Sequence, residues 1–189
     1  MTRRRTLFAL VAVALIAGLA ALAMPVDTRA QLAEGARAPL FTTTGALAGK
    51  PFKFTLAQQL KKGPVVLYFF PKAFTQGCTL EAHAFAEASD DFRKAGATVI
   101  GLSTDDLPAL KKFSREACRD KFAVATASQA IVKAYGVDLK KLGVSTGLTT
   151  RTSFVIAPDR RIVHVHSDMD YKDHVAQSLA AVRALKKAR

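Results

Sequence analysis

The chain has 189 residues, a hydrophobic content of 50% and a formal net charge of +13 at pH 7. This length predicts a single domain, and the apolar fraction is sufficient to bury a substantial core. The two cysteines form no Cys-x-x-Cys pair and no Cys/His cluster at zinc-site spacing, and the chain has no internal repeat, which argues against zinc modules and repeat proteins.

The first 30 residues have the composition of a targeting sequence. Arg3–Arg5 form a basic start, and residues 7–24 form an uncharged apolar run. Short triplets of small residues offer cleavage after Ala23 or Ala30, and the arginines also permit a twin-arginine export signal. We therefore expect residues 1–30 to be a signal peptide or, if they are not cleaved, a membrane anchor. Either case predicts that the remaining domain, residues 31–189, is periplasmic or otherwise exported.

Basic residues remain in excess when residues 1–30, which carry four arginines and one aspartate, are set aside. They occur as dispersed pairs, such as Lys61–Lys62 and Lys140–Lys141, with no stripe of alternating basic and aromatic residues. This dispersion favours a solvated surface over a nucleic-acid interface, and we expect no nucleic-acid partner. An acidic redox partner would be attracted to such a surface.

Residues 31–50 contain Pro39, Gly45 and Gly49 and are expected to be mainly loop. The expected elements that follow are a short strand (51–56), a helical turn (57–62), a buried strand (65–70), a long helix (78–94) and a second buried strand (97–102). The run 65–70 is continuously apolar, which is typical of a central strand covered on both faces. Strand, helix and strand at this spacing indicate a βαβ unit with parallel pairing.

The second half of the chain continues this alternation. Its expected elements are a helix (110–118), a short strand (122–125), a helix (129–135), a long loop (137–149), a hairpin (152–156 and 162–166) and a terminal helix (170–187). Strands that alternate with helices predict an α/β fold. We expect a thioredoxin-like sandwich, with a mixed, mostly parallel central sheet flanked by helices.

The segment most informative about function is Pro71-Lys72-Ala73-Phe74-Thr75-Gln76-Gly77-Cys78. It places a lone cysteine, Cys78, where a buried strand turns into the first turn of a helix. The N–H groups and dipole of a helix N-terminus favour a thiolate, which is the reactive form of cysteine. From position alone, a buried structural cysteine is an equally good interpretation.

The pattern Pro-x-x-x-Thr-x-x-Cys resembles the active-site signature of the peroxiredoxins, the cysteine-dependent peroxidases of the AhpC/TSA superfamily. The later block Arg151-Thr152-Ser153-Phe154-Val155-Ile156 resembles the family's arginine-bearing strand, and Ala38-Pro39-Leu40-Phe41 resembles its opening segment. The residues after Cys78 resemble the bacterioferritin-comigratory, or Q-type, branch. The resemblance extends from about Gln31 to the C-terminus. It implies a thioredoxin-like fold and a thiol-dependent peroxidase that needs no metal, haem or flavin cofactor.

The resemblance also implies roles for individual residues. Cys78 would attack the peroxide, the Thr75 hydroxyl would bond the thiolate, and Arg151 would stabilise developing negative charge. Supporting roles would fall to Pro71, which shields the pocket, to Gly77, whose N–H donates, and to Glu81, which orients an arginine. Taken singly, Thr75 would be only a helix N-cap, Arg151 a surface residue and Pro71 a strand terminator.

Recycling of the oxidised cysteine is ambiguous in the sequence. Many Q-type members carry a second, resolving cysteine five residues after the first, where this chain has His83, whereas others carry it after a phenylalanine, where this chain has Ser114. Cys118 lies four residues beyond Ser114, and we expect it to resolve the oxidised Cys78 as an internal disulfide. The alternative is a one-cysteine cycle in which an external thiol attacks Cys78. The expected partners are a peroxide and a thioredoxin-like or small-thiol reductant, and family analogy implies a monomer.

Three other functions are weighed against this one. An exported thiol–disulfide oxidoreductase would need Cys-x-x-Cys, and a copper carrier on this fold would need two nearby cysteines. A structural protein would use Cys78–Cys118 as a permanent disulfide. His164 and His166 alternate on one strand face, but no third metal ligand is in reach, so no metal site is predicted. The hairpin turn at residues 158–161 lacks the glycine usual in the family, so Arg160 is expected to adopt a strained backbone or a different turn type.

Overall fold

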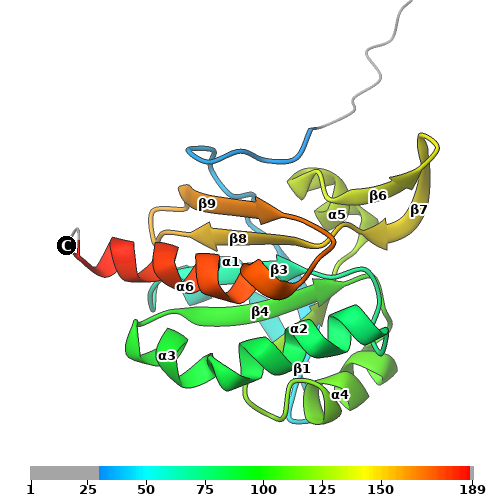
Figure 1. The fold of residues 1–189 in the computed structure, drawn as a ribbon, viewed down its shortest axis with the longest axis horizontal. Helices are drawn as coiled ribbons and strands as arrows, with labels where there is room; N and C mark the ends of the chain where they lie inside the picture. Colours follow the sequence, from blue (N-terminus) through cyan, green and yellow to red (C-terminus); the bar gives the residue numbers. More distant parts are fainter. Residues whose placement is uncertain (1–29, 188–189) are drawn as a thin grey trace, which may run out of the picture.

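The computed structural model describes residues 30–187 (Figure 1). The expected leader lies outside this range apart from its last residue, Ala30. The elements in chain order are β1 (Thr42–Leu47), β2 (Lys50–Thr55), α1 (Leu56–Leu60), β3 (Val65–Phe69), α2 (Gln76–Glu87), α3 (Ser89–Lys94), β4 (Thr98–Ser103), α4 (Leu107–Glu116), β5 (Ala123–Thr126), α5 (Gln129–Tyr135), β6 (Asp138–Lys141), β7 (Val144–Thr149), β8 (Thr152–Ile156), β9 (Ile162–Ser167) and α6 (Lys172–Lys187). Among these helices, none has the length and apolar character needed to cross a membrane.

Seven strands form one sheet in the order β2-β1-β5-β4-β3-β8-β9. The pairs β3–β4 and β4–β5 are parallel, whereas the other four neighbouring pairs are antiparallel. The α/β sandwich with a mixed sheet is confirmed, but the expectation that the sheet is mostly parallel is wrong. Helical crossovers align only β3, β4 and β5, because β1–β2 and β8–β9 are hairpins, which pair antiparallel.

Alternating side chains of β3 contribute to both halves of the core. Val65, Leu67 and Phe69 pack in a cluster with residues of α1 and α5, whereas Val66 and Tyr68 pack in a second cluster with residues of α2, α3, α4 and α6. Figure 1 shows α2, α3 and α6 on one side of the sheet. The continuous apolar run of β3 is therefore explained by a helical layer on each face.

Two segments expected to be loops contain strands. β1 has three threonines and a glycine in place of an apolar run, and it is a strand because it pairs with both β2 and β5. β6 and β7 form a separate hairpin whose turn residues, Leu142 and Gly143, have φ values of +51° and +79°. Positive φ at both positions is the geometry of a type I′ turn, which Leu-Gly signals less clearly than Asn-Gly.

The expected helix 78–94 is divided into α2 and α3 at Ala88. The Ser89 hydroxyl donates a hydrogen bond of 2.9 Å to the Phe85 carbonyl. A side-chain hydroxyl that bonds to the carbonyl one turn earlier competes with the helical backbone and favours a break at this position.

The strained turn expected at Arg160 is confirmed. Arg160 has a φ of +75°, which is unfavourable for a residue with a side chain. Its guanidinium donates from Nε and Nη2 to the Ala38 carbonyl at 3.2 and 3.0 Å. These bonds attach the β8–β9 turn to the segment that opens the domain and help to hold the turn in this conformation.

Candidate active site

Cys78 lies in the first turn of α2, directly after the loop that follows β3. Its side chain is 1% exposed, and its Sγ accepts a hydrogen bond from Arg151 Nη2 at 3.5 Å. Gly77 permits this contact, because a Cβ at that position would lie 3.0 Å from the same nitrogen. The thiol therefore faces a cation and lies at the N-terminus of a helix, where positive charge and backbone N–H groups are found.

Arg151 occupies the short segment between β7 and β8 and is 4% exposed. Besides Cys78, its guanidinium donates from Nε to the Met169 carbonyl at 3.0 Å and from Nη1 to Glu81 Oε2. Burial lowers its pKa, but the acidic groups of Glu81 and Cys78 outweigh burial, and the net pKa of Arg151 is raised. The guanidinium is thus a permanent positive charge in a fixed orientation.

Glu81 lies one helical turn after Cys78 and is fully buried. Burial raises the pKa of this carboxyl to about 8, and Arg151 opposes the rise through its charge and its hydrogen bond. The structure therefore brings Arg151 next to the start of α2, where Gly77, Cys78 and Glu81 lie. Arg151 is 70 residues from Glu81 and 73 residues from Cys78 in the chain. Arg151 Nη1 and Glu81 Oε2 are in direct contact, and the expected role of Glu81, to orient an arginine, stays a prediction.

Thr75 and Pro71 lie in the loop before Cys78. Thr75 is the N-cap residue of α2 by its backbone, but its exposed hydroxyl donates to the Lys72 carbonyl at 3.0 Å. The expected hydrogen bond between this hydroxyl and the Cys78 sulfur is therefore replaced, in this conformation, by one within the loop. Pro71 is buried where β3 ends.

Asp105 is a site residue that sequence reasoning missed. Its Oδ2 accepts hydrogen bonds of 2.8 Å from the Ala73 backbone N–H and from the Ser103 hydroxyl. It follows β4, which lies beside β3 in parallel, so both loops leave the same edge of the sheet. That adjacency is the sequence signal that could have identified it.

Behind Glu81 lies His174, which sequence reasoning also missed. It is fully buried in the first turns of α6, and its Nδ1 lies 2.8 Å from Ser153 Oγ and 3.7 Å from Glu81 Oε1. Its Nε2 lies 3.0 Å from the Asp168 carbonyl. The only available signal is a polar residue next to the apolar face of the terminal helix, which by itself does not indicate a site.

Cys118, like Cys78, is a free and buried thiol. It was expected inside a helix, but α4 ends at Glu116, and Cys118 lies in the turn that follows. The next residues, Arg119 and Asp120, have φ values of +51° and +58°, which lie outside the range of a right-handed helix. Burial, and to a lesser extent Asp120, raises the pKa of the Cys118 thiol.

Tyr68 of β3 connects the surroundings of the two cysteines. Cys78 and Cys118 belong to the same hydrophobic cluster as Tyr68, whose buried hydroxyl has no hydrogen-bond partner. Burial raises its pKa, and so do the nearby acidic groups of Cys118, Glu81 and Cys78. One side chain is therefore within electrostatic range of both thiols.

The remaining histidines do not form a metal centre in the described part of the chain. His164 Nδ1 lies 3.2 Å from Glu34 Oε1, and the His166 ring packs against that of His174 at 4.5 Å. Residues 30–187 contain no group of three or more His, Cys, Asp or Glu side chains placed to bind an ion. His83 is half-buried on α2.

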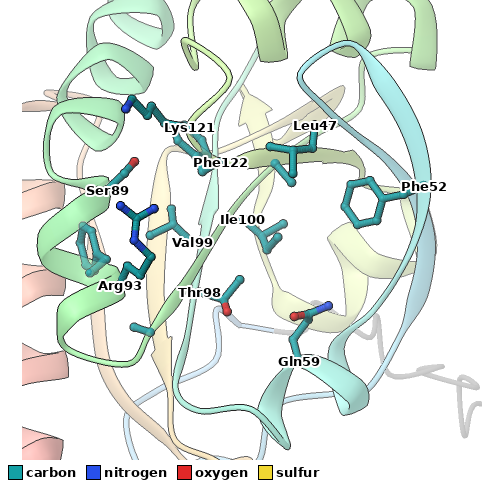
Figure 2. Close-up of a pocket in the computed structure, with 13 residues that line it drawn as sticks. Leu47, Phe52, Gln59, Ser89, Arg93, Thr98, Val99, Ile100, Lys121 and Phe122 are labelled. Carbon is teal, nitrogen blue, oxygen red and sulfur yellow. The ribbon is translucent and has the colours of Figure 1, made fainter.

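A cavity of about 310 Å³ lies away from this cluster (Figure 2). Its walls include Thr98 and Ala123, the first residues of β4 and β5, and also Phe52 of β2. Cys78 follows the opposite, C-terminal end of β3, so the cavity and the thiol lie at opposite ends of the parallel strands. None of the candidate catalytic residues lines it.

Comparison with known proteins adds independent information. The sequence profile described as the AhpC/TSA family matches residues 35–165. The chain is 32% identical to Peroxiredoxin Bcp of Escherichia coli over 112 residues, which are 58% of this chain and 72% of that protein. It is 28% identical to chloroplastic Peroxiredoxin Q of Oryza sativa over 156 residues, which are 82% of this chain and 69% of that protein.

A solved structure agrees with these sequence relatives. The crystal structure of Peroxidoxin BcpB from Mycobacterium tuberculosis superposes with a TM-score of 0.70 at 32% sequence identity. The match covers 82% of this chain and 99% of that one. The expected thioredoxin-like sandwich and the resemblance to the Bcp and Q-type branch are therefore confirmed.

Proposed function

This chain belongs to the AhpC/TSA family of peroxiredoxins, and we propose that it uses Cys78 to reduce hydrogen peroxide and organic hydroperoxides. The observation that carries this proposal is the 3.5 Å contact between Cys78 Sγ and the buried Arg151 guanidinium at the start of α2. A thiolate is the nucleophile that peroxide reduction requires, and this position favours one. Family membership makes the protein a peroxidase; the assignment of the attacking residue is our proposal.

In the proposed reaction, the thiolate of Cys78 attacks one peroxide oxygen. An S–O bond forms, the O–O bond breaks, sulfur is oxidised to sulfenic acid, and the peroxide is reduced to water or an alcohol. Arg151 stabilises negative charge on the reacting oxygens. Thr75 reaches the peroxide if its hydroxyl exchanges the Lys72 carbonyl for the substrate, and the N–H groups of Gly77 and Cys78 supply further donors.

We propose that Cys118 then attacks the sulfenic acid. The Cys78–Cys118 disulfide forms, water leaves, and a thioredoxin-like or small-thiol reductant restores both thiols. Because both sulfurs are buried, the start of α2 and the turn at Cys118 must open locally. The left-handed residues Arg119 and Asp120 support this step, because each carries a backbone cost that opening relieves.

Intact mass spectrometry of the full chain tests both assignments. One equivalent of hydrogen peroxide should remove two hydrogens and join Cys78 to Cys118 in the peptide map. Cys118→Ser should instead gain one oxygen on Cys78 and fail to recycle with a thioredoxin-type reductant. Cys78→Ser should not consume peroxide. Unchanged multiple-turnover kinetics in Cys118→Ser would favour the one-cysteine cycle, and an active Cys78→Ser would remove the proposed nucleophile.

We also propose that the protein is exported. The proposal depends on the basic start and apolar run of residues 1–30. Fractionation of cells that express the full chain, with N-terminal sequencing of the product, should find it outside the cytoplasm and beginning after Ala23 or Ala30. A full-length product in the cytoplasmic fraction would contradict export.

A further inference from the structure

Glu81 lies between Arg151 and His174 with its two carboxyl oxygens in different environments. Oε2 accepts a hydrogen bond from Arg151, whereas Oε1 is buried and has no hydrogen-bond partner. His174 Nδ1 lies 3.7 Å from Oε1, beyond hydrogen-bond distance. An ionised carboxylate oxygen without a donor is costly in a buried site, so the state of Oε1 requires an explanation.

The contacts of His174 determine which of its nitrogens carries the proton. Nε2 faces the Asp168 carbonyl, which can only accept, so Nε2 is the N–H. Burial lowers the pKa of His174 to about 4, and the ring is therefore neutral near pH 7. Nδ1 then presents a lone pair, which accepts from the Ser153 hydroxyl. His174 therefore has no N–H directed at Oε1, and an ionised Oε1 would face an electron-rich nitrogen with no donor to stabilise its charge.

The charges around Glu81 support the same conclusion. Arg151 is the one cationic side chain among the buried polar residues of the described range, and it contacts two acids, Cys78 and Glu81. Other titratable groups that interact with Glu81, Arg151 or His174 are Tyr68 of β3, His166 of β9, and Asp168 and Asp170 before α6. None of these supplies a second permanent positive charge. Two anions opposite one cation would leave a buried negative charge uncompensated.

We propose that Cys78 and Glu81 share a single negative charge opposite Arg151, so that Glu81 is a protonated acid whenever Cys78 is a thiolate. This inference rests on the proposed function of Cys78 as the attacking thiolate. His174 is then a positioning residue: it offers no N–H donor to Oε1, which disfavours the carboxylate form of Glu81 and leaves the charge of Arg151 available to the sulfur.

The shared charge has a consequence for the oxidation step. The thiolate, the protonated Glu81 and the peroxide react to give neutral sulfenic acid, ionised Glu81 and water or an alcohol. The proton that balances the products leaves Glu81, and the single negative charge moves from sulfur to the carboxylate. Glu81 therefore changes its protonation state when Cys78 is oxidised.

Infrared difference spectroscopy of the full chain tests this exchange. The protein carries Cys118→Ser, to prevent disulfide formation, and ¹³C-labelled glutamate, of which the chain has four residues. One equivalent of hydrogen peroxide should remove a carboxylic-acid band and produce a carboxylate band. Both signals should be absent in Glu81→Gln and present in the control Glu116→Gln, which changes an exposed glutamate.

The outcomes separate this inference from the proposed function. If mass spectrometry finds one added oxygen on Cys78 but no carboxyl band changes, Glu81 keeps one protonation state throughout and the shared charge is wrong, although Cys78 remains the nucleophile. If Cys78 is not oxidised, the proposed function itself fails, and the inference falls with it.

A second variant tests His174. In His174→Gln, the amide can donate an N–H to Oε1 and stabilise the carboxylate, so the acid band of the unreacted protein should shrink at neutral pH. His83→Gln, on the same helix as Glu81 but outside this cluster, should leave the band unchanged. Ser153→Ala keeps the histidine, so the acid band of Glu81 should be present in this variant. It provides a second test if His174→Gln does not fold. An acid band in folded His174→Gln equal to that of the wild type would overturn the role of His174.

Discussion

Arg151 makes direct contacts with both Cys78 and Glu81 of the candidate site. Its three guanidinium nitrogens contact the Cys78 thiol and the Glu81 carboxyl group of α2 and the backbone carbonyl of Met169, which precedes α6. A planar guanidinium can make these contacts together, whereas the single ammonium of lysine cannot. The orientation of the positive charge beside Cys78 therefore depends on the residue type as well as on its charge.

Arg151→Lys should fold but lose about 100-fold in the rate of Cys78 oxidation, because removal of one preorganised donor of this kind typically costs 10²–10³. Stopped-flow measurement of peroxide reduction checks this expectation. Arg183→Lys, which changes an exposed arginine paired with Asp91, is the control and should react normally. A rate within a factor of two of wild type would mean that charge alone is sufficient.

Gly77→Ala should separate stability from activity. Alanine favours a helix over glycine by roughly 1 kcal/mol, so the folded state should be unchanged or more stable. The added Cβ would lie 3.0 Å from Arg151 Nη2 and should displace the guanidinium from Cys78. We expect slower peroxide reduction together with an unchanged or higher denaturation midpoint. Gln76→Ala, at the exposed neighbouring position, should keep full activity.

The loop between β3 and α2 is held in place by an element outside its own sequence. Asp105, at the end of β4, bonds to the Ala73 N–H inside the loop. Phe74 has a φ of +64°, and its ring packs on Phe113 of α4 at 5.3 Å, so this strained residue also depends on a neighbour. The position of Cys78 is thus set by parallel pairing of β3 with β4 and by the helix that follows β4.

Asp105→Ala should release this loop. The Ala73 N–H and the Ser103 hydroxyl would lose a charged acceptor, which typically costs about 1.5–3 kcal/mol. We expect that loss in the free energy of unfolding measured with urea, together with slower peroxide reduction. Asp90→Asn, which changes an exposed acid on α3, should alter neither by a comparable amount. Normal activity in Asp105→Ala would show that the loop keeps its conformation without this bond.

Across the whole molecule, two buried groups should give stability opposite dependences on pH. The pKa of Glu81 rises from 4.5 to about 8 on folding, so the folded state binds the extra proton and stability falls as pH increases between these values. The pKa of His174 falls from 6.5 to about 4, so the unfolded state binds the extra proton and stability rises with pH in that window. The two effects oppose each other between pH 4.5 and 6.5, where these groups should leave stability nearly flat.

Above pH 6.5 the contribution of Glu81 is no longer opposed, and stability should fall through about pH 8 by at most about 1.4 kcal/mol per pH unit. Urea denaturation at a series of pH values checks this profile. Glu81→Gln should abolish the fall above pH 6.5 and leave a rise between pH 4 and 6.5. A wild-type profile that rises from pH 6.5 to 8 would contradict the raised pKa of Glu81.

Much of the fold follows from local patterns in the chain. The apolar run of β3, the glycine that ends α5 and the spacing of the terminal hairpin all reflect periodicity and turn chemistry that neighbouring residues impose on each other. β1 and the β6–β7 hairpin were missed because their strand character comes from pairing partners and not from their own composition. The same cause explains the overestimate of parallel pairing, since β1 and β2 add antiparallel pairs.

The candidate site divides in a similar way. Cys78 and its motif can be found from the sequence, because a thiol at a strand-to-helix turn has a local reason to be reactive, and Arg151 can be found through the resemblance of its block to the family. Asp105, His174 and the turn position of Cys118 could not be found, because contacts between segments far apart in the chain determine them. Local sequence therefore determined the fold class and singled out Cys78 as the candidate nucleophile, whereas long-range packing in a low-dielectric interior sets which groups surround that thiol.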